Sequence, residues 1–159
     1  MKLMVIGPPV PKGSARAFVI PGKGDQSPRA VVVQNNKKAL AHWQTQIGNE
    51  ARTAMNSTQV PPPFDGPFIV SVTFRLNRPR SVSVKDRPVP TVKPDLDKLV
   101  RAVLDALTGI LWRDDAQVVT IIATKRYLKT AGPECLEIGL TEWWDSDHDH
   151  PTVGGRKFY

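Results

Sequence analysis

The sequence predicts an α+β fold, with a mixed β-sheet of about four to five strands and two main helices packed on it. Apolar residues alternate strictly from Phe68 to Leu76, which is the period of a strand with one buried face. Apolar residues recur every three or four positions from Asn36 to Met55, and again from Leu96 to Thr108, as in helices packed along one side. We expect one domain over residues 1–142 and a tail over residues 143–159.

The amino-terminal part is predicted to contain strands and loops. Lys2 to Ile6 form a short apolar strand that ends at a Gly-Pro-Pro run. The segment PVPKGSAR is broken by proline and glycine, so Lys12 and Arg16 are expected on a loop. Ala17–Ile20 and Ala30–Gln34 are predicted to be the two arms of a hairpin with a long polar tip.

The first predicted helix begins at an asparagine cap and carries an apolar stripe. Its members are Leu40, Trp43, Ile47, Ala51 and Ala54. We interpret Trp43 as a core residue because it lies on this stripe. The helix is expected to pack on the sheet.

The second half alternates between exposed and buried segments. Residues 77–94 are basic and rich in proline, which predicts an exposed, partly disordered loop. Gln117 to Leu128 are apolar on both faces, as in a central strand covered on both sides. Cys135 to Leu140 are predicted to pair back as the last strand, with the side chain of Cys135 buried.

The amino-acid composition favours some classes of function and excludes others. The chain has 22 basic and 15 acidic residues, a net charge of +7, and a pI near 9.8. Basic surfaces gain affinity for nucleic acids by releasing counterions from phosphates. A single cysteine excludes an internal disulfide and a cysteine-based zinc cluster. The apolar runs are too short to cross a bilayer or to form a secretory signal, so we expect a cytoplasmic protein.

Four carboxylates are concentrated around the second helix of this basic chain. Asp95 and Asp97 lie at its start, and Asp114 and Asp115 follow its end. Mg²⁺ is commonly bound by one or two carboxylates together with water and substrate phosphate. If the chain returns after the helix, an aspartate of the second pair can bind the same metal ion as the first pair. The residues alone thus indicate a metal-dependent phosphodiester enzyme.

A purely structural role explains the same aspartates. Asp95 then caps the helix, Asp97 complements the helix dipole and pairs with Arg101, and the second pair forms an exposed turn. A tail sequence, DSDHDH, offers another set of metal ligands that includes His148 and His150, although such tails are usually just solvated.

The residues around the acids resemble the RusA-like Holliday-junction resolvases of bacteria and prophages. The match lies in KPDLDKL, in RAVLDALTG and in LWRDDAQVV, which is followed by Lys125, in the family's order and with nearly its spacing. The opening segment GPPVPKGSAR is similar to the family's first loop. The resemblance therefore runs from Gly7 to Leu140.

The resemblance implies a homodimeric nuclease that uses Mg²⁺, or Mn²⁺ in its place, to cut paired strands symmetrically at a four-way DNA junction, in recombination and repair. The family's three catalytic acids correspond to Asp95, Asp97 and Asp115, the expected metal ligands. A metal held there would polarise the scissile phosphate and lower the pKa of a bound water. The family's catalytic lysine falls at Arg101, and the asparagine that commonly follows its second aspartate is Lys98 here.

Arginine stays protonated and cannot shuttle protons, but it can hold a phosphate. We therefore predict that Arg101 is an electrostatic contact. Lys12, Arg16, Lys98 and Lys125 are predicted to bind the DNA backbone, with an affinity that falls steeply as salt rises.

Two alternatives remain open at this point. The chain could bind junctions without cutting them, with the arginine in place of the family lysine marking a lost activity. It could also be a sugar-nucleotide transferase with a D-x-D motif, although no glycine-rich phosphate loop precedes that motif.

Overall fold

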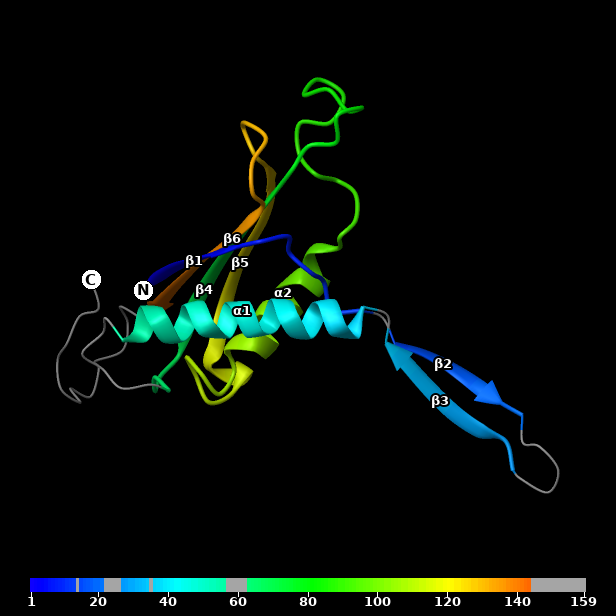
Figure 1. Cartoon of the computed structure of the whole chain (residues 1–159). Coiled ribbons are helices and arrows are strands. Elements are labelled where there is room, and N and C mark those ends of the chain that lie inside the picture. Colours follow the sequence, from blue (N-terminus) through cyan, green and yellow to red (C-terminus); the bar gives the residue numbers. More distant parts are fainter. Residues whose placement is uncertain (14, 22–26, 35, 57–62, 144–159) are drawn as a thin grey trace.

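A computed structural model of the chain describes residues 1–13, 15–21, 27–34, 36–56 and 63–143. Its main sheet has four strands in the order β1-β6-β4-β5. They are β1 (Lys2–Ile6), β4 (Phe68–Leu76), β5 (Val118–Tyr127) and β6 (Cys135–Glu142). Two helices, α1 (Lys37–Met55) and α2 (Leu96–Leu107), pack against this sheet and against each other (Figure 1). The predicted α+β fold with a mixed sheet and two main helices is confirmed.

The sheet is mixed because α2 connects two parallel strands. β4 and β5 pair in parallel, whereas β6 runs antiparallel to both β4 and β1. Parallel neighbours need a long crossover, and the chain supplies it as a loop, then α2, then a tight return. The 3₁₀ turn η1 (Asp115–Gln117) ends that return and leads directly into β5. β5 therefore runs back along the length of α2.

The position of β5 corrects one prediction. We predicted a central strand buried on both faces, but β5 is an edge strand, and the side chains of Val119 and Ile122 are 52% and 58% exposed. The central strands are β4 and β6. An apolar run indicates that a strand can be buried on both faces, but it does not show which elements pack against it. α2 packs against β5 but covers only part of it, so several apolar side chains of β5 stay exposed.

The core lies between the helices and the sheet. Its largest fully buried members are Trp43, Trp112, Phe74, Ile47, Leu99 and Leu107. Trp43 is a core residue, as predicted, and the side chain of Cys135 is buried in the last strand, also as predicted. Burial raises the pKa of the Cys135 thiol, so the reactive thiolate is disfavoured.

The predicted hairpin is present and forms its own two-stranded sheet. β2 (Ala15–Ile20) pairs antiparallel with β3 (Arg29–Gln34), and the hairpin extends away from the four-stranded sheet near the start of α1 (Figure 1). Only the backbone of Arg16 is described, so the predicted contact of its side chain with DNA lies outside the described residues. The tail from residue 144 onward, with its DSDHDH run, is outside them as well.

The basic loop between β4 and α2 is exposed but internally organised. The guanidinium of Arg78 donates to the carbonyl oxygens of Ser83, Arg87 and Pro88. It also stacks over the ring of Tyr127, 4.1 Å from the ring centroid. Arg78 thus shapes this loop, whereas the sequence predicted partial disorder. In the part of the chain that the structure describes, no helix is long and apolar enough to cross a membrane.

Candidate active site

The first acidic pair lies where the chain enters α2. Pro94 disfavours helical backbone for the residue before it, and Asp95 is the extended cap residue with φ −70° and ψ 136°. The first helical hydrogen bond runs from the Leu99 amide to the Asp95 carbonyl, at 3.1 Å. The Asp95 side chain does not cap the helix. Its Oδ2 instead accepts a hydrogen bond from Nζ of Lys98 at 2.8 Å.

Positive charges around Asp95 keep its carboxylate ionised. The hydrogen bond from Lys98 is the main cause that lowers the pKa of Asp95, and the nearby charges of Lys93 and Lys125 act in the same direction. The pKa of Lys98 is raised by the same hydrogen bond. A lowered carboxyl pKa means that the negative charge is lost only as the pH falls below the usual range of an aspartate. Asp95 is therefore charged and solvent-accessible at neutral pH.

Asp97 is an exposed carboxylate in the first turn of α2. Arg101 lies one turn further along and is also exposed, but no ion pair joins these two described residues. The structural explanation of Asp97 as a partner of Arg101 is thus not supported. Asp97 is left free to bind a cation beside Asp95, and Arg101 is left free to bind an anion.

A hollow of about 340 Å³ opens next to these acids. Its lining combines one carboxylate with three ammonium groups: Asp95, Lys12, Lys93 and Lys98, together with Pro11, Gly13 and Pro94. The amino-terminal loop closes one side because the amide of Lys12 donates to the carbonyl of Lys98 at 2.9 Å. A polyanion that enters this hollow meets lysines beside the acidic pair.

Two of the predicted DNA-binding lysines already have partners in the chain. Nζ of Lys12 pairs with Asp105 at 2.7 Å, so Asp105 fastens the amino-terminal loop to α2, which the sequence did not predict. Nζ of Lys125 donates to the carbonyl oxygens of Val92 and Pro94, at 2.9 and 2.8 Å. Lys125 therefore ties the end of β5 to the residues directly before Asp95.

The second acidic pair lies at the other end of α2. The Asp115 carboxylate accepts from Nε1 of Trp112 at 3.0 Å and from the hydroxyl of Thr108, the residue that caps the carboxyl end of α2. Asp114 caps the following turn by accepting from the amide of Ala116 at 2.8 Å. These contacts fix Asp115 within the turn that precedes β5.

Asp115 is thus remote from Asp95 within one chain. α2 has 12 residues, so its ends are about 18 Å apart at 1.5 Å per residue. Among the described residues, no three histidine, cysteine or acidic side chains are grouped closely enough to hold a metal ion. The chain does return after α2, but the return brings the basic end of β5 to Asp95 and leaves the second acidic pair at the opposite end of the helix.

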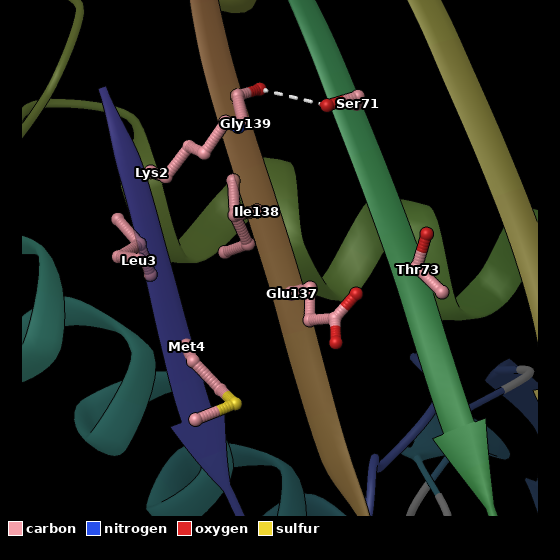
Figure 2. A pocket seen from close by; sticks show the side chains of 8 residues that line it. All are labelled: Lys2, Leu3, Met4, Ser71, Thr73, Glu137, Ile138 and Gly139. Atoms are coloured by element: carbon pink, nitrogen blue, oxygen red, sulfur yellow. Dashed lines mark hydrogen bonds between the residues drawn. The ribbon is translucent and has the colours of Figure 1, made fainter. Parts of the chain in front are cut away.

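A larger hollow, of about 450 Å³, lies on the sheet and does not share residues with the acidic pair. Figure 2 shows its lining on β1, β6 and β4, with the hydroxyl of Ser71 donating to the carbonyl of Gly139 at 3.5 Å. Its one carboxylate, Glu137, is bound by the guanidinium of Arg75, with Nη2 3.0 Å from Oε2. The hollow beside Asp95 is therefore the better candidate for phosphate chemistry.

Residues 8–136 match the family model of the endodeoxyribonuclease RusA. The chain belongs to the RusA family. It is also similar to a protein of Bacillus subtilis (strain 168) called "Uncharacterized protein YqaN", with 28% identity over 136 residues that cover 80% of this chain and 87% of the relative. The RusA match includes both acidic pairs and the lysine-lined hollow.

Membership in the RusA family implies nuclease activity of the Holliday-junction resolvase type. Asp95 and Asp97 fit the way Mg²⁺ is usually held, with one or two carboxylates and with water and substrate phosphate in the remaining positions. Sequence reasoning missed Thr108 and Trp112, the side chains that hold Asp115. A local signal for the Trp112 contact was present, because Trp112 precedes Asp115 by only three residues and both follow the end of the predicted helix.

Proposed function

We propose that this RusA-family protein is a Mg²⁺-dependent endonuclease that resolves four-way DNA junctions by paired symmetric incision, with Mn²⁺ able to replace Mg²⁺. The observation that carries the proposal is the amino end of α2. There, two exposed carboxylates lie beside a hollow lined by three lysines, in a chain whose family cleaves DNA. Carboxylates that can bind a cation thus lie beside lysines that can bind a phosphodiester.

Asp95 and Asp97 would hold the ion from the first turn of α2. A bound Mg²⁺ would supply a polarised scissile phosphate and a water of lowered pKa. The ammonium groups of Lys93 and Lys98 would bind the phosphates on either side of the scissile bond. Lys98 also keeps Asp95 ionised, and this hydrogen bond must be shared with, or yield to, an incoming cation.

A cleavage assay on matched substrates tests this function. A labelled synthetic four-way junction, its linear duplex and a flap are incubated with the protein in Mg²⁺, in Mn²⁺ and in excess EDTA. We expect the junction to be cut at least about 10-fold faster than the other substrates, at symmetry-related positions in two opposed strands, and only with metal present. A junction that is bound but stays uncut with either metal would instead support the non-catalytic binding protein. Equal cutting of all three substrates would contradict junction selectivity.

Arg101 is proposed to contact phosphate electrostatically. Arg101→Ala should lower the single-turnover rate of junction cleavage about 10- to 100-fold, because one charge-stabilising donor is lost. Arg101→Lys should lower it less, since the charge remains but the planar fork is lost. The pH profile of the rate should keep its shape in Arg101→Ala, because an electrostatic contact transfers no proton in the reaction.

The matched control for Arg101 is Arg52→Ala. Arg52 is an exposed arginine in the last turn of α1, and its guanidinium donates to the side-chain oxygen of Asn49 on the same helix. It should cut at the wild-type rate. Wild-type cleavage by Arg101→Ala would remove Arg101 from the proposed site, and an altered pH profile in Arg101→Ala would contradict a purely electrostatic role.

A further inference from the structure

We infer that the loop of residues 77–94, between β4 and α2, recognises the branch point of the DNA, where Val84 and Val89 pack on base faces that a linear duplex keeps stacked. The inference rests on the proposed function and names the feature of the substrate that this surface contacts. Its starting point is a loop that is exposed and basic and yet has a defined shape. Such a loop can present side chains to a ligand without the entropy loss of first ordering its backbone.

Arg78 gives the 77–94 loop its shape. Its guanidinium donates to the carbonyl oxygens of Ser83 and Pro88, both at 3.2 Å, and to that of Arg87. The hydroxyl of Ser83 donates to the Asp86 carboxylate at 2.6 Å, and the carbonyl of Ser83 accepts from the Arg87 amide at 3.2 Å. The tip of the loop is therefore held as one folded unit around a single arginine.

The 77–94 loop is also fixed to the end of the sheet that lies beside the acidic pair. Arg78 stacks over the ring of Tyr127, at the end of β5, 4.1 Å from the ring centroid. Nζ of Lys125 donates to the carbonyl oxygen of Pro94 at 2.8 Å, directly before Asp95. Figure 1 shows the loop, in green, extending beyond this end of the sheet and then returning to the start of α2. DNA bound at Asp95 is therefore close to this loop.

The side chains that the loop exposes are both apolar and positive. Val84 is 66% exposed and Val89 is 50% exposed. Arg80 and Lys85 are exposed as well, and no ion pair joins either of them to a described residue. The one acid of the loop, Asp86, already accepts a hydrogen bond within it. A single exposed valine is common, but here two valines lie among unpaired cations on a loop whose backbone is fixed.

Branched DNA offers both kinds of partner that this surface requires. The cations fit backbone phosphates. The valines need an apolar surface, and in a linear duplex the base faces are stacked on each other, so the grooves expose only base edges. An apolar side chain that enters a duplex must first separate two base steps, which costs a few kcal/mol. At a four-way junction the stack is already interrupted where strands cross over. The valines therefore gain more contact at the branch point than along an arm.

A binding assay with a double variant tests this recognition. Val84→Ser/Val89→Ser is compared with the wild type on a labelled four-way junction and on a linear duplex, without metal, so that no strand is cut. We expect affinity for the junction to fall about 10-fold, because two apolar contacts are lost. Affinity for the duplex should not change, since the cations remain. Both side chains are exposed, so the thermal midpoint should stay that of the wild type. Wild-type affinity of the double variant for the junction would overturn the inference.

Met4→Ser is the matched control for the two valines. Met4 is 53% exposed and lies on β1, at the edge of the sheet opposite to β5. Its replacement removes exposed apolar surface at a place remote from the loop, so both DNA substrates should bind with wild-type affinity. A fall in junction affinity as large as that of the double variant would contradict a specific role of the valines.

A fluorescent base reports the contact directly. 2-Aminopurine becomes brighter when it is unstacked, and it is placed either at the branch point of the junction or in the middle of one arm. Binding of the wild type should raise the fluorescence at the branch point and leave that in the arm unchanged. The double variant, at a concentration that saturates the junction, should give a smaller rise. An equal rise with both proteins would mean that the valines do not contact the bases.

The outcomes separate this inference from the proposed function. A wild type that cuts junctions, together with a double variant that binds them equally well, overturns branch recognition by the loop and leaves the nuclease function intact. A loss of junction preference in the double variant, in a protein that cuts no junction with Mg²⁺ or Mn²⁺, supports the recognition and contradicts the nuclease function. An equal loss of affinity for junction and duplex would mean general DNA binding by the valines and would overturn the inference.

Discussion

Replacing Asp95 with asparagine is expected to lower the rate of junction cleavage on the order of 1,000-fold, because the neutral amide cannot hold a divalent cation as the carboxylate does. Junction affinity, measured by gel shift with Ca²⁺ or without metal, should be retained or rise slightly, since one negative charge is removed from a lysine-lined hollow. A lower cleavage rate with unchanged DNA affinity would identify Asp95 as a ligand of the catalytic metal. A residue needed for DNA binding would lose affinity as well.

The folded state should tolerate this substitution. The Asp95 carboxylate is exposed and does not cap α2, so its loss breaks one surface ion pair with Lys98 and no helical hydrogen bond. The thermal midpoint of Asp95→Asn should therefore stay close to that of the wild type. A large drop would assign the loss of activity to unfolding.

Asp65→Asn is the matched control for Asp95→Asn. Asp65 is also an exposed aspartate with one basic partner, Arg113, at 3.3 Å. It precedes β4 and lies apart from the hollow, so this variant should cut at the wild-type rate. Cleavage at the wild-type rate by Asp95→Asn itself would remove Asp95 from the proposed metal site.

Local sequence signals predicted the amino end of α2 well. Pro94 and the apolar stripe that starts at Leu96 fix where the helix begins, and the charge pattern around Asp95 and Asp97 is a property of adjacent residues. The pairing of Lys98 with Asp95 is of the same kind, since residues three apart lie together on a helix. Features of this type depend on backbone geometry that neighbouring residues determine.

The place of Asp115 could not be predicted because it depends on topology. The spacing of the two acidic pairs is compatible with a site at either end of α2. Which end is chosen follows from the direction of β5, and therefore from its parallel pairing with β4, which no short pattern encodes. The same limit explains why β5 was predicted to be central. Its composition describes what it can contact, whereas the strand order determines what it does contact.

Long-range polar contacts were also missed. The pairing of Lys12 with Asp105 joins residues 93 positions apart in the numbering, and the contact of Lys125 with Pro94 joins strand to loop. The sequence predicts both lysines as contacts to the DNA backbone and does not predict these partners within the chain. The structure indicates that they also hold the amino-terminal loop and the entry to α2, so removing either one should disturb the site as well as its affinity for DNA.

Trp112→Ala is expected to destabilise the protein by about 3–5 kcal/mol, because the indole is fully buried and its removal leaves a cavity. For a chain of this size, such a loss lowers the thermal midpoint by about 10 °C. The backbone around the indole is closely constrained as well. Gly109, with φ 76°, turns the chain after α2, and its amide donates to the Trp112 carbonyl at 2.7 Å. Thermal unfolding followed by circular dichroism measures the effect.

Trp112→Phe separates packing from the hydrogen bond to Asp115. Phenylalanine keeps most of the buried apolar volume but cannot donate to the Asp115 carboxylate, so we expect a loss of about 1 kcal/mol in stability. The rate of junction cleavage should fall more than this modest destabilisation predicts, because Asp115 loses the indole that orients it and keeps only the Thr108 hydroxyl. Trp43→Phe is the matched control, since Trp43 is also buried and its indole nitrogen has no hydrogen-bond partner in the described structure. Equal cleavage rates for the two phenylalanine variants would mean that the orientation of Asp115 by Trp112 does not matter for catalysis.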